Sequence, residues 1–225
     1  MTDDEMAGHL LPENELARLN ALSQYDILDT PDASGFDTLT ILAAAIFESE
    51  YAHICFVGKE HAYFKASTGN ITVIQTDRKN SLCSASISNK NPTVLYHTHE
   101  FSKEISFYAA APIITREGFV LGTIAVTDSK PHQQVTDQQL KMLQMLADLV
   151  MEKLEIRLSD INTLATYNER LRTLAHDIKN PVTSISLYAQ LLSAKEMQKE
   201  KVFSMAERIE NSIKRIEETL NNLFM

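Results

Sequence analysis

The chain has 225 residues, 44% of them hydrophobic and 23% charged, with only six glycines and six prolines. This composition is typical of one sizeable or two small soluble globular domains and argues against long disordered linkers. The net charge of −9 arises within residues 1–150, because residues 151–225 hold 11 basic and 11 acidic side chains; neither part has the basic surface that binding to nucleic acid requires.

The cysteines and the first residues indicate the compartment. Cys55 and Cys83 stand in apolar segments without metal-ligand spacing, which predicts reduced, buried thiols in preference to a disulfide or a cofactor anchor. Residues 1–5 are acidic and do not resemble a secretory signal, and no run of about 18 apolar residues predicts a membrane span. We therefore expect a cytoplasmic protein.

The first half of the chain predicts two helices followed by strands. Apolar residues at helical spacing predict helices over residues 13–25 and 36–46, with turn-forming residues 29–32 between them. Short apolar runs at 52–58 and 62–66, punctuated by Gly58 and Gly69, predict strands.

A hairpin is predicted next, from apolar runs at 107–114 and 119–126. Between them lie residues 116–118, which end in a glycine suited to a positive φ. A helix should begin at about Asp137. Helices, then strands, then a helix predict one α+β domain with a central antiparallel sheet.

The second half predicts long helices. From Asp137 to residue 225 there is no glycine and only one proline, Pro181, and apolar residues recur in steps of three and four. This heptad spacing, interrupted at about residues 193–199, predicts a long connecting helix that runs into a helical hairpin. Two helices have too small a core to stand alone, so we expect a second copy to complete a four-helix bundle. The alternative is an antiparallel pair packed on the first domain.

One group of residues in these helices indicates a chemistry. His176 lies off the centre of the apolar seam, with an acid, Asp177, beside it. A carboxylate bonded to the protonated ring nitrogen would stabilise the cation that forms when the other nitrogen attacks phosphorus. Asn180 follows on the same face one turn later, where an amide can position a water molecule. Pro181 should kink the helix, although simple tolerance within a bundle is the alternative.

Residues 164–225 resemble the dimerisation and histidine-phosphotransfer domain of sensor histidine kinases, whose core motif matches residues 176–181. The resemblance implies that His176 is the phosphoacceptor, that Asp177 assists the transfer, and that Asn180 supports dephosphorylation of a response regulator. It implies a homodimer, the receiver domain of a response regulator and an ATP-binding kinase lobe as partners.

Residues 13–155 resemble a GAF sensor domain, through the stretches 25–31, 81–83, 108–113 and 122–128. Together the two resemblances predict four parts. These are a tail (1–12), a GAF domain (13–150), a connecting signalling helix (151–167) and a helical hairpin for dimerisation and phosphotransfer (168–225).

The ATP-binding lobe of sensor kinases has no counterpart in this sequence. We find neither its asparagine box nor glycine-rich segments that would surround a nucleotide. The chain is therefore expected to need a kinase lobe, in cis if it is cut from a longer protein or in trans if it is not. ATP and Mg²⁺ would bind only to that lobe, so histidine kinase activity is an expectation from the family and not from this chain alone.

The ligand of the GAF domain is left open. A covalent bilin is not expected, because neither cysteine is followed by a histidine. His97 and His99 would share one face of a strand, but no acidic or cysteine third ligand completes the spacing, so a solvated loop is expected there in preference to a metal site. Arg78 and Lys79 suit either a small anion or simple solvation.

The sequence thus predicts a signalling protein of a two-component phosphorelay, in which the GAF domain senses a signal and controls the phosphorylation of His176. The continuous helix would carry the change. The alternative is a non-catalytic GAF ligand-binding module dimerised by a coiled coil.

Overall fold

The computed structural model describes residues 12–28, 35–69, 74–96, 105–132, 134–194 and 198–221. The chain forms two compact units, Met1–Leu158 and Ser159–Met225. The elements of the first unit are α2 (Glu15–Gln24), α3 (Asp37–Phe47), β1 (Tyr51–Val57), β2 (His61–Ser67), β3 (Gln75–Asp77), the 3-10 helix η1 (Arg78–Asn80), α4 (Leu82–Ser86), β4 (Thr93–Tyr96), β5 (Phe107–Ile114), β6 (Val120–Asp128) and the beginning of α5 (Asp137–Ala194). The rest of α5 and α6 (Lys199–Asn221) form the second unit.

The predicted α+β architecture with an antiparallel sheet is confirmed. The strand order is β3-β2-β1-β6-β5-β4, and every pair of neighbours is antiparallel. The predicted hairpin is formed by β5 and β6, where Gly118 has a φ of 86° and donates its N–H to the carbonyl oxygen of Thr115 at 2.9 Å. The turn predicted at residues 29–32 lies outside the described residues.

A second glycine allows the two central strands to approach. A Cβ atom added to Gly122 on β6 would overlap the carbonyl oxygen of Cys55 on β1. The register places Cys55 opposite Thr123 on β6 and opposite Phe64 on β2. Cys55 therefore lies on a central strand whose backbone is tightly enclosed.

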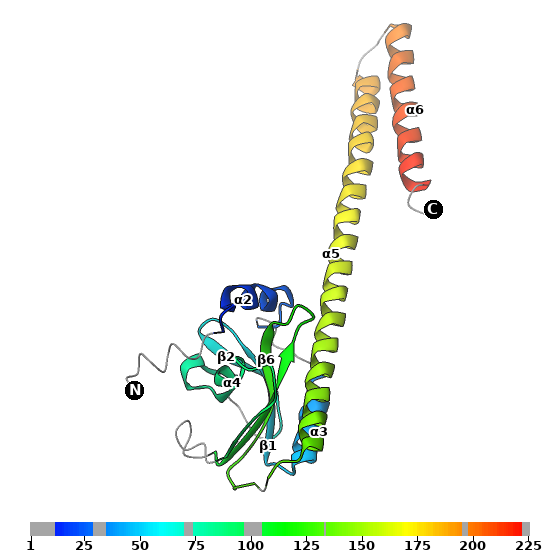
Figure 1. Cartoon of the computed structure of the whole chain (residues 1–225). Helices are drawn as coiled ribbons and strands as arrows, with labels where there is room; N and C mark the ends of the chain where they lie inside the picture. The colour runs from blue at the N-terminus through cyan, green and yellow to red at the C-terminus, as the bar shows by residue number, and fades with distance from the viewer. Residues whose placement is uncertain are drawn as a thin grey trace. The chain divides into compact units, whose positions relative to one another are not determined.

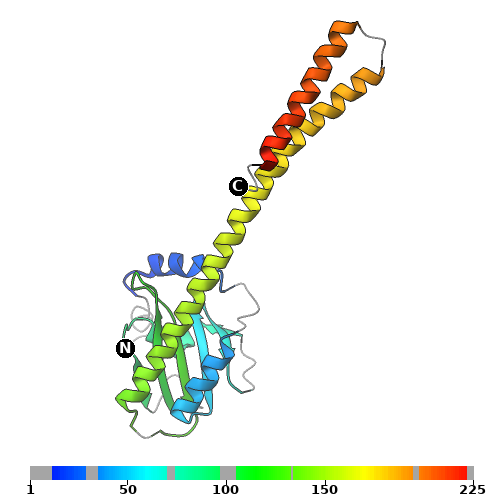
Figure 2. The same cartoon turned by 90° about the vertical axis from the view of Figure 1, so that its right-hand side faces the viewer.

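The two faces of the sheet are covered by different helices. Side chains of β1 alternate between the faces, as the strand period of two requires. Ala52, Ile54 and Phe56 belong to the main core, together with residues of α3 and the first part of α5. Figure 2 shows these two helices in front of the sheet, while Figure 1 shows α4 on the opposite side.

Helix α5 is anchored firmly in the first unit. Its buried side chains recur at helical spacing and are Leu143, Leu146, Ala147, Val150, Met151 and Leu154. Each large apolar side chain that is fully buried stabilises the fold by about 1.5–3 kcal/mol. The beginning of α5 is thus an integral part of the core.

The second unit is a helical hairpin with an open apolar surface. In both views α6 runs beside the last part of α5 in the opposite direction (Figures 1 and 2). Arg208 on α6 donates to the Tyr188 hydroxyl on α5 at 3.1 Å, with its guanidinium carbon 5.8 Å from the ring centroid. No residue of α6 is buried. Large apolar side chains of both helices are exposed: Leu164, Tyr167, Leu171, Val182, Leu187, Leu191, Val202, Phe203, Ile213 and Leu220. No helix among the described residues is long and apolar enough to cross a membrane.

Candidate functional site

His176 lies on the solvent-exposed surface of α5, within the second unit. Its side chain is 70% exposed, and that of Asp177 is 44% exposed. A helix of ordinary pitch places residues 176 and 180 one above the other, because four residues make slightly more than one turn. The imidazole is therefore accessible to a macromolecular partner.

Both ring nitrogens of His176 have a neighbour. Nδ1 lies 3.3 Å from a carboxylate oxygen of Asp177, and Nε2 lies 3.3 Å from the amide nitrogen of Asn180. A carboxylate only accepts hydrogen bonds, so Nδ1 carries the proton and Nε2 keeps its lone pair, to which the Asn180 amide donates. Both distances are long for hydrogen bonds, so Asn180 can be displaced from Nε2 at little cost. The structure thus brings His176, Asp177 and Asn180 together in one cluster.

Pro181 follows this cluster inside α5, and the helix continues past it to Ala194. Proline has no N–H, so the carbonyl of Asp177 loses its usual helical donor. Thr183 and Ser184 donate their hydroxyls to the carbonyls of Lys179 and Asn180 at 2.8 and 3.1 Å. Such back-bonding is associated with helix bending. Pro181 therefore weakens the helix directly beside the histidine.

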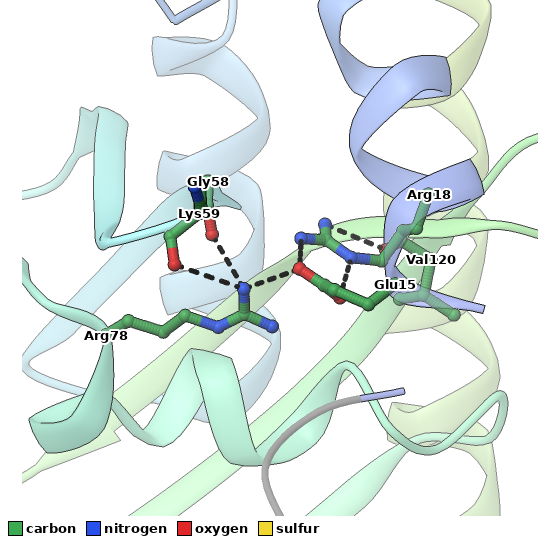
Figure 3. Close-up of polar contacts among 6 residues, drawn as sticks. All are labelled: Glu15, Arg18, Gly58, Lys59, Arg78 and Val120. Atoms are coloured by element: carbon green, nitrogen blue, oxygen red, sulfur yellow. Dashed lines mark hydrogen bonds and ion pairs between the residues drawn. The ribbon is translucent and has the colours of Figure 1, made fainter. Parts of the chain in front are cut away.

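A second cluster of charged residues lies in the first unit and is drawn in Figure 3. Glu15 binds the Arg18 guanidinium through both carboxylate oxygens at 2.8 Å and binds Arg78 at 2.6 Å. Arg78 also donates to the carbonyl oxygen of Gly58 at 2.9 Å. Burial acts to raise the pKa of Glu15, but the hydrogen bonds from Arg18 and Arg78 outweigh it and lower this pKa from 4.5 to about 2.

This arrangement corrects one expectation for Arg78. The residue is 6% exposed, so it is not a solvated surface residue, and Glu15 already occupies one of its terminal nitrogens. Its Nε and Nη2 atoms are buried and have no partner among the described residues. Lys79 is exposed. The cluster ties α2 to η1 and to the β1–β2 turn, which is a structural role.

The histidines of the first unit have separate environments. The His132 ring stacks on Phe107 at 4.1 Å and lies 2.9 Å from a carboxylate oxygen of Asp128. His61 meets the ring of Tyr63 edge-on. His97 and His99 lie outside the described residues. In the part of the chain that the structure describes, no three His, Cys, Asp or Glu side chains are grouped to hold a metal ion.

A buried thiol cluster lies between the sheet and α4. Cys55 and Cys83 are free and fully enclosed, at 0% and 2% exposure. Cys55 and Cys83 pack in one buried cluster, and His53 Nε2 lies 3.3 Å from the Cys83 sulfur. The His53 ring is held edge-on against Phe64 at 5.1 Å. We call these three residues, His53, Cys55 and Cys83, the thiol cluster.

The two thiols of the cluster differ in acidity. Burial raises the pKa of Cys55 well above its ordinary value, and its bond to Cys83 raises it further. The hydrogen bond from Cys55 lowers the pKa of Cys83 well below its ordinary value against the effect of burial, with help from His53 and Thr123. Cys83 is therefore the more acidic of the two thiols.

Polar side chains line the same space. The Tyr108 hydroxyl lies 3.1 Å from the hydroxyl of Ser86, and burial raises the pKa of Tyr108 well above its ordinary value. The hydroxyl of Ser84 is buried without a hydrogen-bond partner among the described residues. The sequence predicted two buried thiols but not the contact between Cys83 and His53. The alternation of His53 and Cys55 on one strand was the signal, whereas nothing local pointed to Cys83.

Two family models match the chain. The GAF domain matches residues 27–154, and the His Kinase A (phospho-acceptor) domain matches residues 167–225. The chain therefore belongs to the GAF-domain family. With its phospho-acceptor domain it has the domain pair of a sensor histidine kinase.

Similar proteins are known for part of the chain. Over 165 residues the chain is 28% identical to the cyclic di-GMP phosphodiesterase PA2567 of Pseudomonas aeruginosa. The match covers 66% of this chain and 27% of that protein. The chain thus spans about a quarter of the length of this relative.

Solved structures with a similar fold include two GAF domains. One, from an Acinetobacter phosphoenolpyruvate-protein phosphotransferase, is 14% identical with a TM-score of 0.48 and covers 67% of this chain and 96% of that one. The other is from a putative sensor histidine kinase of Pseudomonas syringae pv. tomato and is 18% identical with a TM-score of 0.47. This match covers 68% of this chain and 95% of that one.

Proposed function

We propose that the protein acts in a two-component phosphorelay, in which His176 accepts a phosphoryl group and passes it to an aspartate of a response regulator. The observation that carries this proposal is the exposed His176 ring, with Asp177 at Nδ1 and Asn180 at Nε2, inside a phospho-acceptor domain. The GAF domain would sense the signal and control the transfer.

The geometry supports Nε2 as the nucleophile. Asp177 holds the proton on Nδ1 and stabilises the positive charge that develops on the ring during attack. Asn180 leaves Nε2 as the γ-phosphoryl group of ATP approaches, and Nε2 forms a bond to phosphorus while ADP departs. In the reverse role, the amide of Asn180 orients a water molecule toward a phosphorylated regulator. Pro181 provides the weak point at which the helix bends between these states.

The partners follow from the open hairpin. Its exposed apolar side chains need a cover, and a second copy of the hairpin supplies one by forming a four-helix bundle. ATP and Mg²⁺ enter on a kinase lobe, in cis or in trans. The proposed relay operates in the cytoplasm. We do not extend the phosphodiesterase activity in the relative's name to this chain, because the chain spans only 27% of that protein.

The test is phosphorylation by an active histidine kinase lobe with γ-labelled ATP. We expect acid-labile, alkali-stable label on the wild type and none on His176→Gln. His61→Gln is the matched control, because it removes a histidine of the first unit and should leave the label unchanged. Asn180→Ala should still be labelled, but an added response regulator should lose its phosphate more slowly than with the wild type. This result would support the role of the Asn180 amide in dephosphorylation.

The competing function is a GAF ligand-binding module that a coiled coil dimerises and that is never phosphorylated. Absence of label from the wild type with a lobe that labels its own substrate would favour this module. Equal label on the wild type and His176→Gln would remove His176 from the mechanism.

A further inference from the structure

The thiol cluster has no part in the phosphotransfer at His176. Its residues come from two elements far apart in the sequence, β1 and α4, and the side-chain alternation of β1 turns His53 and Cys55 to the face that α4 covers. The two cysteines pack in the same buried cluster, and the imidazole of His53 lies 3.3 Å from the Cys83 sulfur. Two thiols and an imidazole in one enclosed space are the groups that thiol oxidation requires.

We propose that Cys83 and Cys55 are a peroxide-oxidised thiol pair that closes to a disulfide between α4 and β1 within the GAF domain. Both cysteines are free in the structure. This inference is independent of phosphorylation at His176, because it concerns residues and chemistry of the GAF domain alone.

The first step takes place at Cys83. Its thiolate attacks one oxygen of the peroxide, an S–O bond forms, and the O–O bond breaks. The departing hydroxide, or alkoxide for an organic peroxide, takes up a proton. Cys83 becomes a sulfenic acid, having lost two electrons to the peroxide. His53 Nε2 lies 3.3 Å from this sulfur and stabilises its negative charge before the attack.

The second step uses the neighbouring thiol. Cys55 gives up its proton and attacks the Cys83 sulfur, the S–S bond forms, and the S–O bond breaks with release of water. The balance is two thiols and one peroxide to one disulfide and two waters, or one water and one alcohol for an organic peroxide. No further reductant or oxidant is needed.

The fold assigns different roles to the two cysteines. Gly122 of β6 lies against the carbonyl of Cys55, so the backbone of β1 has no room to move at this point. Cys83 lies on α4, a helix of only five residues whose Cα atoms approach those of β1 within 8 Å. A short helix opens locally without unfolding of the sheet, which admits a small oxidant to buried sulfur. Adjustment for the disulfide is therefore expected in α4.

Peptide mass spectrometry of the complete chain tests the proposal. After treatment with hydrogen peroxide and non-reducing trypsin digestion, we expect peptides 19–59 and 80–90 to be joined, with the loss of two hydrogens. Neither peptide contains methionine, so methionine oxidation does not obscure the result. Reduction should separate the two peptides. The intact mass should remain that of a single chain, since a link between chains would contradict the proposal.

Two single variants assign the order of events. Cys55→Ser removes the resolving thiol, so Cys83 should accumulate as a sulfenic acid that dimedone captures on peptide 80–90. Cys83→Ser should leave Cys55 unmodified. In His53→Gln the disulfide should form about tenfold more slowly than in the wild type, which corresponds to the loss of one hydrogen bond to a charged sulfur.

The proposal would be overturned by a wild type that keeps both thiols open to alkylation after peroxide treatment and denaturation. It would also be overturned if dimedone captured Cys55 and not Cys83. The wild-type measurement needs no substitution, so a variant that folds poorly does not prevent a decision.

Discussion

In the GAF domain, α5 contributes six apolar side chains to a closed core, whereas α6 of the helical hairpin has no buried residue. The two histidines of interest differ in the same way. His53 is 6% exposed and bound to a buried thiol, while the side chain of His176 is 70% exposed. The two regions therefore meet different requirements. The GAF domain encloses its reactive groups, and the hairpin presents its histidine to partners.

A substitution in the sheet should give the largest loss of stability in the GAF domain while leaving the hairpin helical. Gly122→Ala places a methyl group on the carbonyl of Cys55, so we expect a loss of about 4 kcal/mol or more in the stability of the GAF domain. Near-ultraviolet circular dichroism during heating measures this loss, while the helical signal of the hairpin should persist.

Gly118→Ala is the matched control for this prediction. It imposes a side chain on a φ of 86° but meets only the flexible end of Lys90, so it should cost about 1 kcal/mol. Equal stability of Gly122→Ala and the wild type would show that the central strands can separate at this point.

A smaller effect is expected from the charge cluster. Glu15→Gln leaves the guanidiniums of Arg18 and Arg78 buried without their shared carboxylate, which should destabilise the GAF domain by about 3 kcal/mol. Urea unfolding followed by tyrosine fluorescence measures the change. The exposed Glu13→Gln serves as control and should alter stability by no more than about 0.5 kcal/mol.

Lowering the pH tests the contribution of the Glu15 carboxylate in a second way. The pKa of Glu15 is lower in the folded protein, at about 2, than its model-peptide value of 4.5. Its contribution to stability is therefore complete above pH 4.5 and is lost as the pH falls toward 2. The difference between the wild type and Glu15→Gln should narrow over this range. A constant difference would mean that the carboxylate does not stabilise the domain through its charge.

The smallest effect is expected in the hairpin. Tyr188→Phe removes the hydrogen bond from Arg208 but keeps the aromatic ring, and both partners are accessible to water. Stability should therefore fall by about 0.5 kcal/mol. Amide hydrogen exchange in α6 measures it, with Arg208→Ala as the comparison that removes both contacts. A large effect would show that this pair, and not a second copy, is the main support of the hairpin.

The sequence predicted the long elements well, because their periodicity is local. The helices now seen as α2, α3 and α5 and the β5–β6 hairpin were all expected. The short β3, β4 and α4 were not, since three to five residues carry too little pattern to distinguish them from loops.

The candidate sites also divide into those formed by residues close in the sequence and those formed by distant residues. His176, Asp177 and Asn180 lie within one turn and a half of helix, so their spacing alone suggested their meeting. Glu15 and Arg78 are 63 residues apart and His53 and Cys83 are 30 residues apart. Only the strand pairing and the packing of α2 and α4 bring these pairs into contact.

The anchoring of α5 has a consequence for how the hairpin acquires its structure. Starting a helix is unfavourable, because several residues must be ordered before the first hydrogen bonds repay that loss of entropy. The core of the GAF domain orders α5 between Leu143 and Leu154, so this first turn is already formed when the domain folds. The remainder of α5 can then grow one residue at a time from this template, so the segment that bears His176 does not have to start a helix of its own.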